Sequence, residues 1–178
     1  LKEEKEGWQS AKTGYDSTNL KYRDCYDFKI RCNEDGSITK PLGNVQKSNQ
    51  NDNDKNIFNL WKDCYDLQQL PVNDYSNMFN LAPLKYWEAF NYIKYNTGQH
   101  FQVHSDHGYS YSCVLSSVGY FNDDYEGGEL YFDKLNLKIK PKSGDLYLFP
   151  SSFIYSHAAL PVTSGIKYAI VTMLDYLE

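Results

Sequence analysis

From residue 86 onward the sequence consists of short runs rich in Tyr, Phe, Val and Ile, separated by Gly, Asn, Asp and Pro. The runs cover residues 86–95, 101–106, 111–121, 129–132, 137–139, 145–149 and 167–174. Such runs are typical of β-strands, and no stretch between them has the spacing of an amphipathic helix. Short strands that follow one another so closely predict an antiparallel barrel or jelly roll.

One more strand is expected near the N-terminus, followed by a long polar segment. Tyr26, Phe28 and Ile30 fall on one face at period two, which predicts a strand over residues 26–31. Residues 33–56 contain hardly an apolar side chain, and we expect a long surface loop there. Composition alone fits a solvated insertion as well as a functional loop.

Two helices are expected between this loop and the strands. Apolar residues at helical spacing predict a first helix over residues 57–67, with Asp54 as N-cap and Pro71 ending it. A shorter helix is expected to begin near Asn73 and to close at Pro83. Helices followed by strands predict the α+β class, in which N-terminal helices buttress a double-stranded β-helix (jelly roll) core.

The length of 178 residues predicts a single domain over residues 1–178. Within it, residues 1–85 would supply the N-terminal strand, the loop and the supporting helices, and residues 86–178 the jelly-roll core. Hydrophobic residues make up 41% of the chain, which is enough to bury one core. The net charge of −5 is a poor electrostatic match to nucleic acid or to an anionic membrane surface, and we expect neither as a partner.

The cysteines and the N-terminal residues suggest a location. Cys25, Cys32, Cys64 and Cys113 form no C-x-x-C pair, so we interpret them as reduced thiols. Residues 1–6 contain no apolar signal-peptide core, although the chain lacks an initiator Met and an upstream segment could have been removed. No apolar run is long enough to span a bilayer. We therefore expect a cytoplasmic protein.

Metal chemistry in this chain depends on few histidines. His104 and Asp106 are two residues apart on an expected strand, so both side chains should project from one face. An H-x-D pair by itself more often has a structural role or lies at the surface than binds a metal. His157, near the start of a late strand, offers a third ligand. Two imidazoles and one carboxylate form the facial triad of non-haem Fe(II) oxygenases, which leaves coordination positions open.

Lys167 interrupts an otherwise apolar strand pattern. From the strand alone, the expected arrangement is an ammonium group that snorkels to solvent, because buried lysines are rare. The alternative is a buried anionic partner, and a dicarboxylate such as 2-oxoglutarate bound at a neighbouring metal would supply one.

Taken in order, several segments resemble the 2-oxoglutarate/Fe(II)-dependent dioxygenases, in particular the prolyl 4-hydroxylase branch. The matching segments are residues 95–106, 120–123, 127–130 and 144–150, then His157, residues 161–165 and residues 167–171. Each segment is a weak signal alone, but the order and spacing agree over about half of the chain.

The resemblance implies a role for each matching residue. His104, Asp106 and His157 match the iron ligands, and Lys167 matches the basic residue that pairs with the distal carboxylate of 2-oxoglutarate; these four are the implied catalytic residues. Tyr95, Tyr120 and Ser116 match further positions of the co-substrate pocket. Among the remaining residues, His100 is interpreted as structural, His107 as lying beside the ligands or facing substrate, and Met173 as standing where some relatives carry Trp.

The implied reaction is hydroxylation of a prolyl residue in a peptide or protein. Fe(II) is the implied cofactor, 2-oxoglutarate and O₂ are the co-substrates, succinate and CO₂ are the products, and ascorbate is a candidate ligand. Under this interpretation residues 33–56 form a lid over the peptide substrate. Tyr109 and Tyr111 are candidate groove residues, with ordinary sheet packing the better expectation for each.

Three alternatives stay open at this point. The same chemistry could act on a free amino acid or on another side chain. The chain could be a catalytically silent jelly-roll binding module, or a zinc hydrolase that uses the same three ligands.

Overall fold

The computed structural model describes residues 8–12, 18–32, 37–39, 45–47, 52–108 and 112–176. These residues form two main sheets whose strand pairs are all antiparallel, a long helix and a separate strand pair. The larger sheet has the order β13 (Leu146–Pro150), β9 (Leu115–Tyr120), β16 (Lys167–Asp175), β7 (Phe90–Tyr95), β3 (Tyr26–Cys32), β4 (Ser37–Thr39) and β5 (Val45–Lys47). In the same sheet β1 (Gln9–Ser10) pairs with β3, and β6 (Tyr86–Trp87) pairs with β16.

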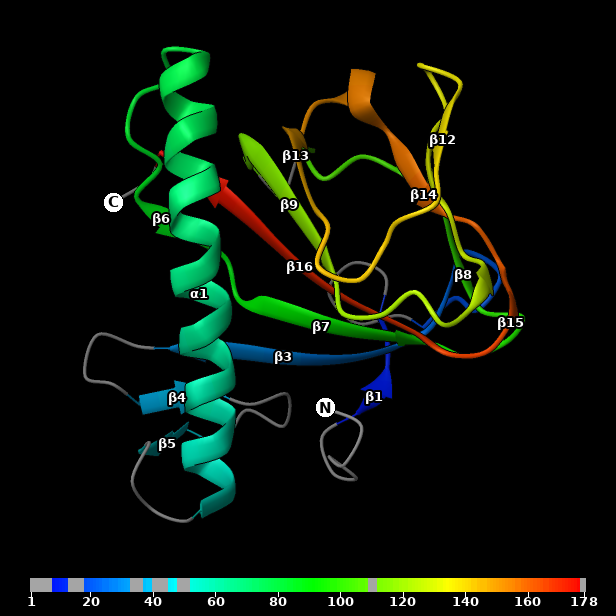
Figure 1. The fold of residues 1–178 in the computed structure, drawn as a ribbon, viewed down its shortest axis with the longest axis horizontal. Coiled ribbons are helices and arrows are strands. Elements are labelled where there is room, and N and C mark those ends of the chain that lie inside the picture. The colour runs from blue at the N-terminus through cyan, green and yellow to red at the C-terminus, as the bar shows by residue number, and fades with distance from the viewer. Residues whose placement is uncertain are drawn as a thin grey trace.

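The smaller sheet has the order β12 (Leu137–Ile139), β11 (Leu130–Phe132), β14 (His157–Ala159), β8 (His100–His104) and β2 (Arg23–Asp24). The pair β10 (Glu126–Gly127) and β15 (Val162–Ser164) stands apart from both sheets, and a short 3₁₀-helix, η1 (Phe153–Tyr155), precedes β14. The helix α1 (Asp52–Met78) crosses the larger sheet, and β8 and β14 lie away from it (Figure 1).

The two faces of the larger sheet bury different partners because side chains alternate along each strand. Phe28, Phe90 and Tyr92 project from the outer face and pack with Ile57 and Cys64 of α1. The inner face packs against the smaller sheet through apolar side chains of β9, β11, β13 and β16; these are Val118, Tyr120, Leu130, Phe132, Phe149 and Ala169. The space between the two sheets is where the candidate site lies.

The expected pair of helices is wrong, because α1 runs without interruption from Asp52 to Met78 with Pro71 inside it. Packing on both sides of Pro71 explains this. Gln68 accepts a hydrogen bond of 2.7 Å from the Ser117 hydroxyl, and Val72 is buried in an apolar cluster beneath β9 and β16. These contacts offset the roughly 3 kcal/mol that an internal proline costs a helix.

The helix also begins and ends elsewhere than expected. It begins at Asp52, so Asp54 lies inside its first turn and is not its N-cap. At the other end Asn80 takes a left-handed conformation (φ 51°), and the Leu81 amide donates to the Ser76 carbonyl. Such a turn closes a helix without proline, before Pro83 is reached.

Replacing Pro71 with Ala should therefore stabilise the protein. The side chain is only partly buried, and the substitution restores a helical hydrogen-bond donor, so the free energy of unfolding should rise by about 1–3 kcal/mol. Urea denaturation checks this, with Leu70→Ala at the exposed neighbouring position as the control. An unchanged or lower midpoint for Pro71→Ala would contradict this explanation of the helix.

Most expected strands are present. The strand at 26–31 is confirmed by β3, and the expected strand 86–95 is divided into β6 and β7. Residues 33–56 are not wholly a loop, since they include β4, β5 and the start of α1. Residues 33–36, 40–44 and 48–51 lie outside the described residues, and the lid stays a prediction. Because β2 and β3 belong to the same sheets as the later strands, residues before 86 contribute to both layers.

Among the described helices, none combines the length and the apolar character that crossing a membrane requires.

Candidate metal centre and its cavity

Two histidines lie opposite each other on neighbouring strands of the smaller sheet. His104 is the last residue of β8 and His157 is the first of β14, and the antiparallel register pairs them directly. Directly paired residues project from the same face of a sheet. The two imidazole rings accordingly lie 4.4 Å apart between centroids.

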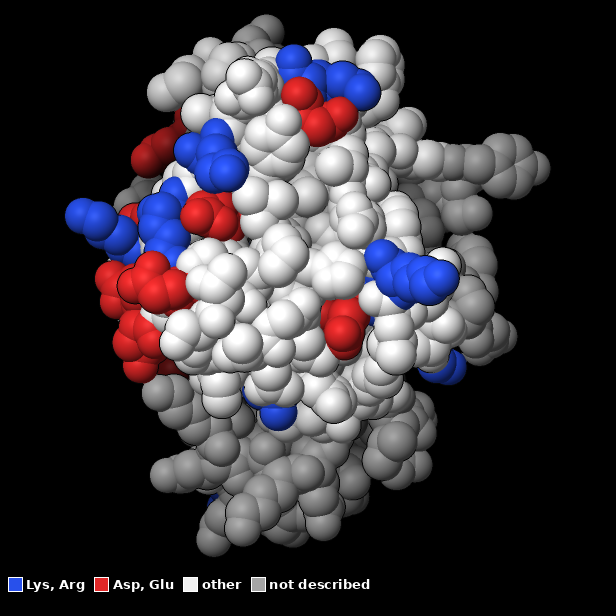
Figure 2. All heavy atoms as spheres, turned by 90° about the vertical axis from the view of Figure 1, so that its right-hand side faces the viewer, with Lys and Arg blue, Asp and Glu red and all other residues white. Residues whose placement is uncertain are grey.

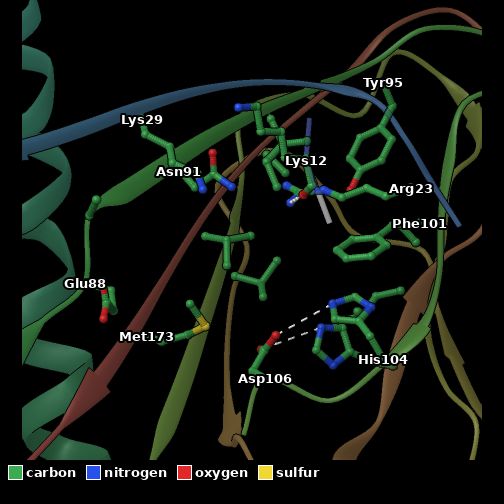
Figure 3. Close-up of a pocket in the computed structure, with 18 of the residues that line it drawn as sticks. Lys12, Arg23, Lys29, Glu88, Asn91, Tyr95, Phe101, His104, Asp106 and Met173 are labelled. Carbon is green, nitrogen blue, oxygen red and sulfur yellow. Dashed lines mark hydrogen bonds and ion pairs between the residues drawn. The ribbon is translucent and has the colours of Figure 1, made fainter. Parts of the chain in front are cut away.

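The carboxylate of Asp106 completes a three-residue cluster. Its Oδ1 lies 3.6 Å from Nε2 of His104, and its Oδ2 lies 3.8 Å from Nε2 of His157 (Figure 3). One ligand atom of each residue lies within 4.8 Å of the others, as a shared metal ion requires. The expectation that Asp106 shares the strand of His104 is wrong, because β8 ends at His104 and Asp106 follows in a bend. The bend nevertheless brings the carboxylate to the same point.

Backbone carbonyls determine which nitrogen each imidazole presents to this point. Nδ1 of His104 lies 2.8 Å from the Gln102 carbonyl, and Nδ1 of His157 lies 3.1 Å from the Tyr155 carbonyl. Because a carbonyl oxygen only accepts, each Nδ1 donates a hydrogen to it, and each Nε2 is the ring nitrogen that faces Asp106. Burial and the neighbouring His157 also lower the pKa of His104 well below its usual range, which keeps this ring neutral. The cluster therefore offers two imidazole nitrogens and a carboxylate.

A buried pair of serines holds the carboxylate. The Ser116 hydroxyl donates to Oδ2 of Asp106 at 2.6 Å and lies 2.8 Å from the Ser151 hydroxyl. Both serines are almost fully buried. The family resemblance implies that Ser116 is a co-substrate residue, and that role stays a prediction. The structure adds its contact with the metal ligand Asp106.

Ser116→Ala should weaken metal binding without removing it. The variant keeps all three ligands but loses the hydrogen bond that orients Asp106, and loss of such an outer partner costs about 10–100-fold in metal affinity. Competition for Fe(II) or Mn(II) against a chelating dye measures this. Ser112→Ala is the matched control, because that hydroxyl donates to Asp175, away from the cluster. Equal affinities in the two variants would exclude an orienting role for Ser116.

The cluster opens onto a cavity of about 450 Å³ that Lys167 also lines. The Lys167 side chain is 1% exposed, so the expectation that it snorkels to solvent is wrong. Its Nζ donates to the Gly128 carbonyl at 2.6 Å and lies 5.1 Å from the ring centroids of both Tyr95 and Tyr120. The two tyrosines are also buried cavity residues, and the co-substrate role that the resemblance implies for them stays a prediction.

The ammonium group of Lys167 is in an unfavourable environment. Burial, together with the charge of Lys140, lowers the pKa of Lys167 to about 7. Among the described residues, no carboxylate forms an ion pair with it. A buried amine in this state gains most from an anion that enters the cavity, because the anion would supply the missing partner.

The other residues singled out from the sequence have varied positions. Met173 lines the cavity. His100 contacts the Lys21 carbonyl at 3.2 Å, in keeping with a structural role, and the exposed His107 contacts the Cys113 carbonyl at 3.0 Å. Tyr109 and Tyr111 lie outside the described residues.

Two residues beside the cluster were missed from the sequence. The Phe101 ring stacks on His104, with centroids 3.7 Å apart, and the guanidinium carbon of Arg23 lies 4.7 Å from the Phe101 centroid. Arg23 reaches Phe101 because β2 pairs with β8. No local sequence pattern predicts the pairing of β2 with β8, because β2 has only two residues.

A cavity lined by two imidazoles, a carboxylate and a buried lysine contains the donor set of the non-haem iron facial-triad proteins. A family model described as the 2OG-Fe(II) oxygenase superfamily, where 2OG is 2-oxoglutarate, matches residues 90–174, which include all three ligands and Lys167. Residues 90–174 thus match this superfamily, whose members require Fe(II), 2-oxoglutarate and O₂.

The relatives with similar sequences carry related names. A putative prolyl 4-hydroxylase of Acanthamoeba polyphaga mimivirus is 30% identical over 139 residues, which cover 65% of this chain and 57% of that protein. The probable prolyl 4-hydroxylase 9 of Arabidopsis thaliana is 31% identical over 117 residues, 49% of this chain and 41% of that protein. The chain thus spans about half the length of these curated relatives.

Solved structures show the same fold. A prolyl hydroxylase from Trichoplax adhaerens, in complex with a hypoxia inducible factor peptide, has a TM-score of 0.68 at 16% identity and covers 95% of this chain and 70% of its own. A viral collagen prolyl hydroxylase from Paramecium bursaria Chlorella virus-1, in complex with 2OG, has a TM-score of 0.55 at 24% identity, over 64% of this chain and 73% of its own.

Proposed function

We propose that this protein is an Fe(II)- and 2-oxoglutarate-dependent dioxygenase that hydroxylates prolyl residues of a peptide or protein and forms succinate and CO₂. The observation that carries the proposal is that His104, Asp106 and His157 share one cavity with the buried ammonium of Lys167. A metal site and a buried cation in one cavity suit a ligand that chelates the metal through one end and carries a carboxylate at the other.

The residues present fit the iron and its co-substrate. His104, Asp106 and His157 would hold Fe(II) and leave coordination positions open, and Lys167 would pair with the distal carboxylate of 2-oxoglutarate. Bound Fe(II) with 2-oxoglutarate supplies the O₂ chemistry that oxidises an unactivated C–H bond. The chain's own contribution is geometric: carbonyls and Ser116 orient the ligands, and the rings of Tyr95 and Tyr120 exclude water from Lys167.

The choice of a prolyl substrate rests on the relatives. The mimiviral and plant relatives are named prolyl 4-hydroxylases. The alternative is the same chemistry on another side chain or on a free amino acid. Mouse procollagen-lysine,2-oxoglutarate 5-dioxygenase 1 is 32% identical over 73 residues, 40% of this chain and 10% of that protein, which makes lysine the first other side chain to test.

Further parts of the proposal concern fold and location. The two facing antiparallel sheets would form the double-stranded β-helix of this family, as one domain with its N-terminal strands and helix. The polar segment 33–56 would act as a lid over peptide. A cytoplasmic location is supported by Cys25, Cys64 and Cys113, which are buried free thiols. Ascorbate stays a candidate ligand.

Mass spectrometry of proline-rich peptides incubated with the protein, Fe(II), 2-oxoglutarate and O₂ tests the proposal. A product heavier by one oxygen atom, formed only when 2-oxoglutarate is present, is the expected result, and fragmentation identifies the modified residue. Oxidation of lysine instead would favour the alternative substrate. Activity with Zn(II) in the absence of O₂ would show a zinc hydrolase and overturn the proposal.

A further inference from the structure

The cavity wall away from the metal centre is basic. Besides Lys167, the cavity is lined by Lys12, Arg23, Lys29 and Arg31, whereas its acidic lining residues are Glu88 and the ligand Asp106. Figure 3 shows Lys12, Arg23 and Lys29 across the cavity from Asp106 and His104. This excess of cations contrasts with the net charge of −5 and with the outer face in Figure 2, where both signs are present and wide areas carry neither.

These cations differ in how many hydrogen bonds and ion pairs they form with other residues of the protein. Arg23 is buried, donates to the Lys12 carbonyl at 3.0 Å and lies 3.6 Å from Asp27. Arg31 is half exposed and pairs with Glu88 at 2.8 Å. Lys29 is exposed, and no described side chain forms an ion pair with its ammonium group. Lys29 is therefore the cation best placed to meet a charge from outside, and Arg31 follows it two residues along the same strand.

The strand register gives the spacing between Lys29 and β9, the strand that carries Ser116. Lys29 of β3 is paired with Asn91 of β7, Asn91 with Val171 of β16, and Val171 with Val118 of β9. These four paired residues cross four adjacent strands. Val118, the residue on β9, lies two positions from Ser116, whose hydroxyl donates a hydrogen bond to Asp106. With strands about 4.8 Å apart, Lys29 stands roughly 14 Å from β9 along the cavity floor.

An extended peptide matches this distance. Such a chain advances about 3.3 Å per residue, so about four residues span the cavity floor between Lys29 and β9, whose Ser116 contacts Asp106. Arg31 follows Lys29 by two residues on β3, and both line the cavity, so the two cations lie on the same face. A peptide whose target residue lies at the metal centre would place a side chain about four positions away beside them.

We propose that Lys29 and Arg31 select peptide substrates that carry an acidic side chain about four residues from the hydroxylated residue. The inference rests on the proposed function and adds the substrate class to it. Exposed charge pairs of this kind contribute modestly to affinity, more to association rate, and lose their effect as salt is added.

Peptide binding tests the inference without requiring turnover. Fluorescence anisotropy is measured anaerobically with the Fe(II)- and 2-oxoglutarate-loaded protein and with proline peptides that differ only in one residue. That residue is Glu, Gln or Lys, placed about two to six positions to either side of the proline. The Glu peptide should bind most tightly at about four positions on one side, about three- to tenfold above the Lys peptide, and about 0.5 M salt should abolish the difference.

Charge reversal provides the decisive comparison. Lys29→Glu should reverse the order, so that the Lys peptide binds better than the Glu peptide. Lys138→Glu, on an exposed position of β12 outside the cavity lining, makes the same change of net charge and should leave the order unchanged. Absence of a Glu preference at every position, or a preference that survives Lys29→Glu, would overturn the inference.

The proposed function and this inference fail separately. A visible charge-transfer band on adding 2-oxoglutarate to the Fe(II) protein depends on the metal centre and on no peptide. If the band forms and the peptides show no charge preference, the inference alone fails. If a preference dependent on Lys29 appears without the band, the selection of acidic peptides stands and the proposed chemistry fails.

Discussion

Asp106→Ala is expected to abolish iron binding and, with it, succinate formation. The carboxylate is the one anionic donor of the cluster and lies between the two Nε2 atoms, so its removal leaves two imidazoles on neighbouring strands. The loss of Fe(II) affinity should exceed about 100-fold, because even an outer partner of a ligand costs about 10–100-fold. Equilibrium dialysis with Fe(II) or Mn(II) measures the affinity, and a coupled assay measures succinate.

Asp63→Ala serves as the control, because this exposed carboxylate lies on α1 beyond the cavity. It should bind metal as the wild type does. Circular dichroism establishes that both variants are folded. A folded Asp106→Ala protein that retains wild-type iron affinity would contradict the assignment of the metal centre.

Lys167→Met should raise the dissociation constant of 2-oxoglutarate by about 100-fold, the cost of removing one partner of a buried charge pair. The variant keeps an unbranched side chain, one heavy atom shorter and uncharged, together with the three metal ligands, so Fe(II) binding should change little. Titration of the anaerobic Fe(II) protein with 2-oxoglutarate gives the constant. Lys138→Met is the matched control at an exposed lysine, and equal constants in the two variants would show that Lys167 does not bind the co-substrate.

The pH dependence of 2-oxoglutarate binding should follow the titration of Lys167. In the folded protein without 2-oxoglutarate, the pKa of the Lys167 side chain is about 7, and only its protonated form attracts a carboxylate. Below pH 7 the dissociation constant should be nearly independent of pH. Above pH 7 it should increase by up to about tenfold per pH unit, because the proton must be taken up on binding. Lys167→Arg, which does not titrate in this range, should remove this dependence.

Local sequence patterns predict most of the longer strands but not the short strands added at the sheet edges. Period-two alternation predicts β3, because Phe28 and Ile30 face α1 whereas Lys29 and Arg31 line the cavity on the other face. Runs rich in aromatic and β-branched residues predict β7 and β16. Sequence patterns do not predict β2, which has only two residues, or β4 and β5, which lie within a polar segment. Pro71 predicts the end of a helix from its missing amide proton, and the packing of Gln68 and Val72 outweighs that local preference.

For the site, the sequence predicts the metal ligands better than it predicts the contacts that position those ligands and Lys167. His104 and Asp106 are close in sequence and His157 is recognisable from motif order. Direct pairing of His157 with His104 depends on strand register over more than fifty residues. The snorkelling expected of Lys167 fails because nothing local reveals that the rings of Tyr95 and Tyr120 enclose the ammonium group. The contact of Ser116 with Asp106 likewise depends on how β9 packs beneath the bend.

The central claim is that three side chains hold one Fe(II) ion whose open positions accept 2-oxoglutarate. Anaerobic addition of 2-oxoglutarate to the Fe(II)-loaded protein tests it most directly, by the visible absorption spectrum. The account predicts a weak metal-to-ligand charge-transfer band that is absent from His104→Ala and that reaches saturation in wild type at a single equivalent. A wild-type protein that binds iron and shows no such band, or a band of full intensity in His104→Ala, would contradict it.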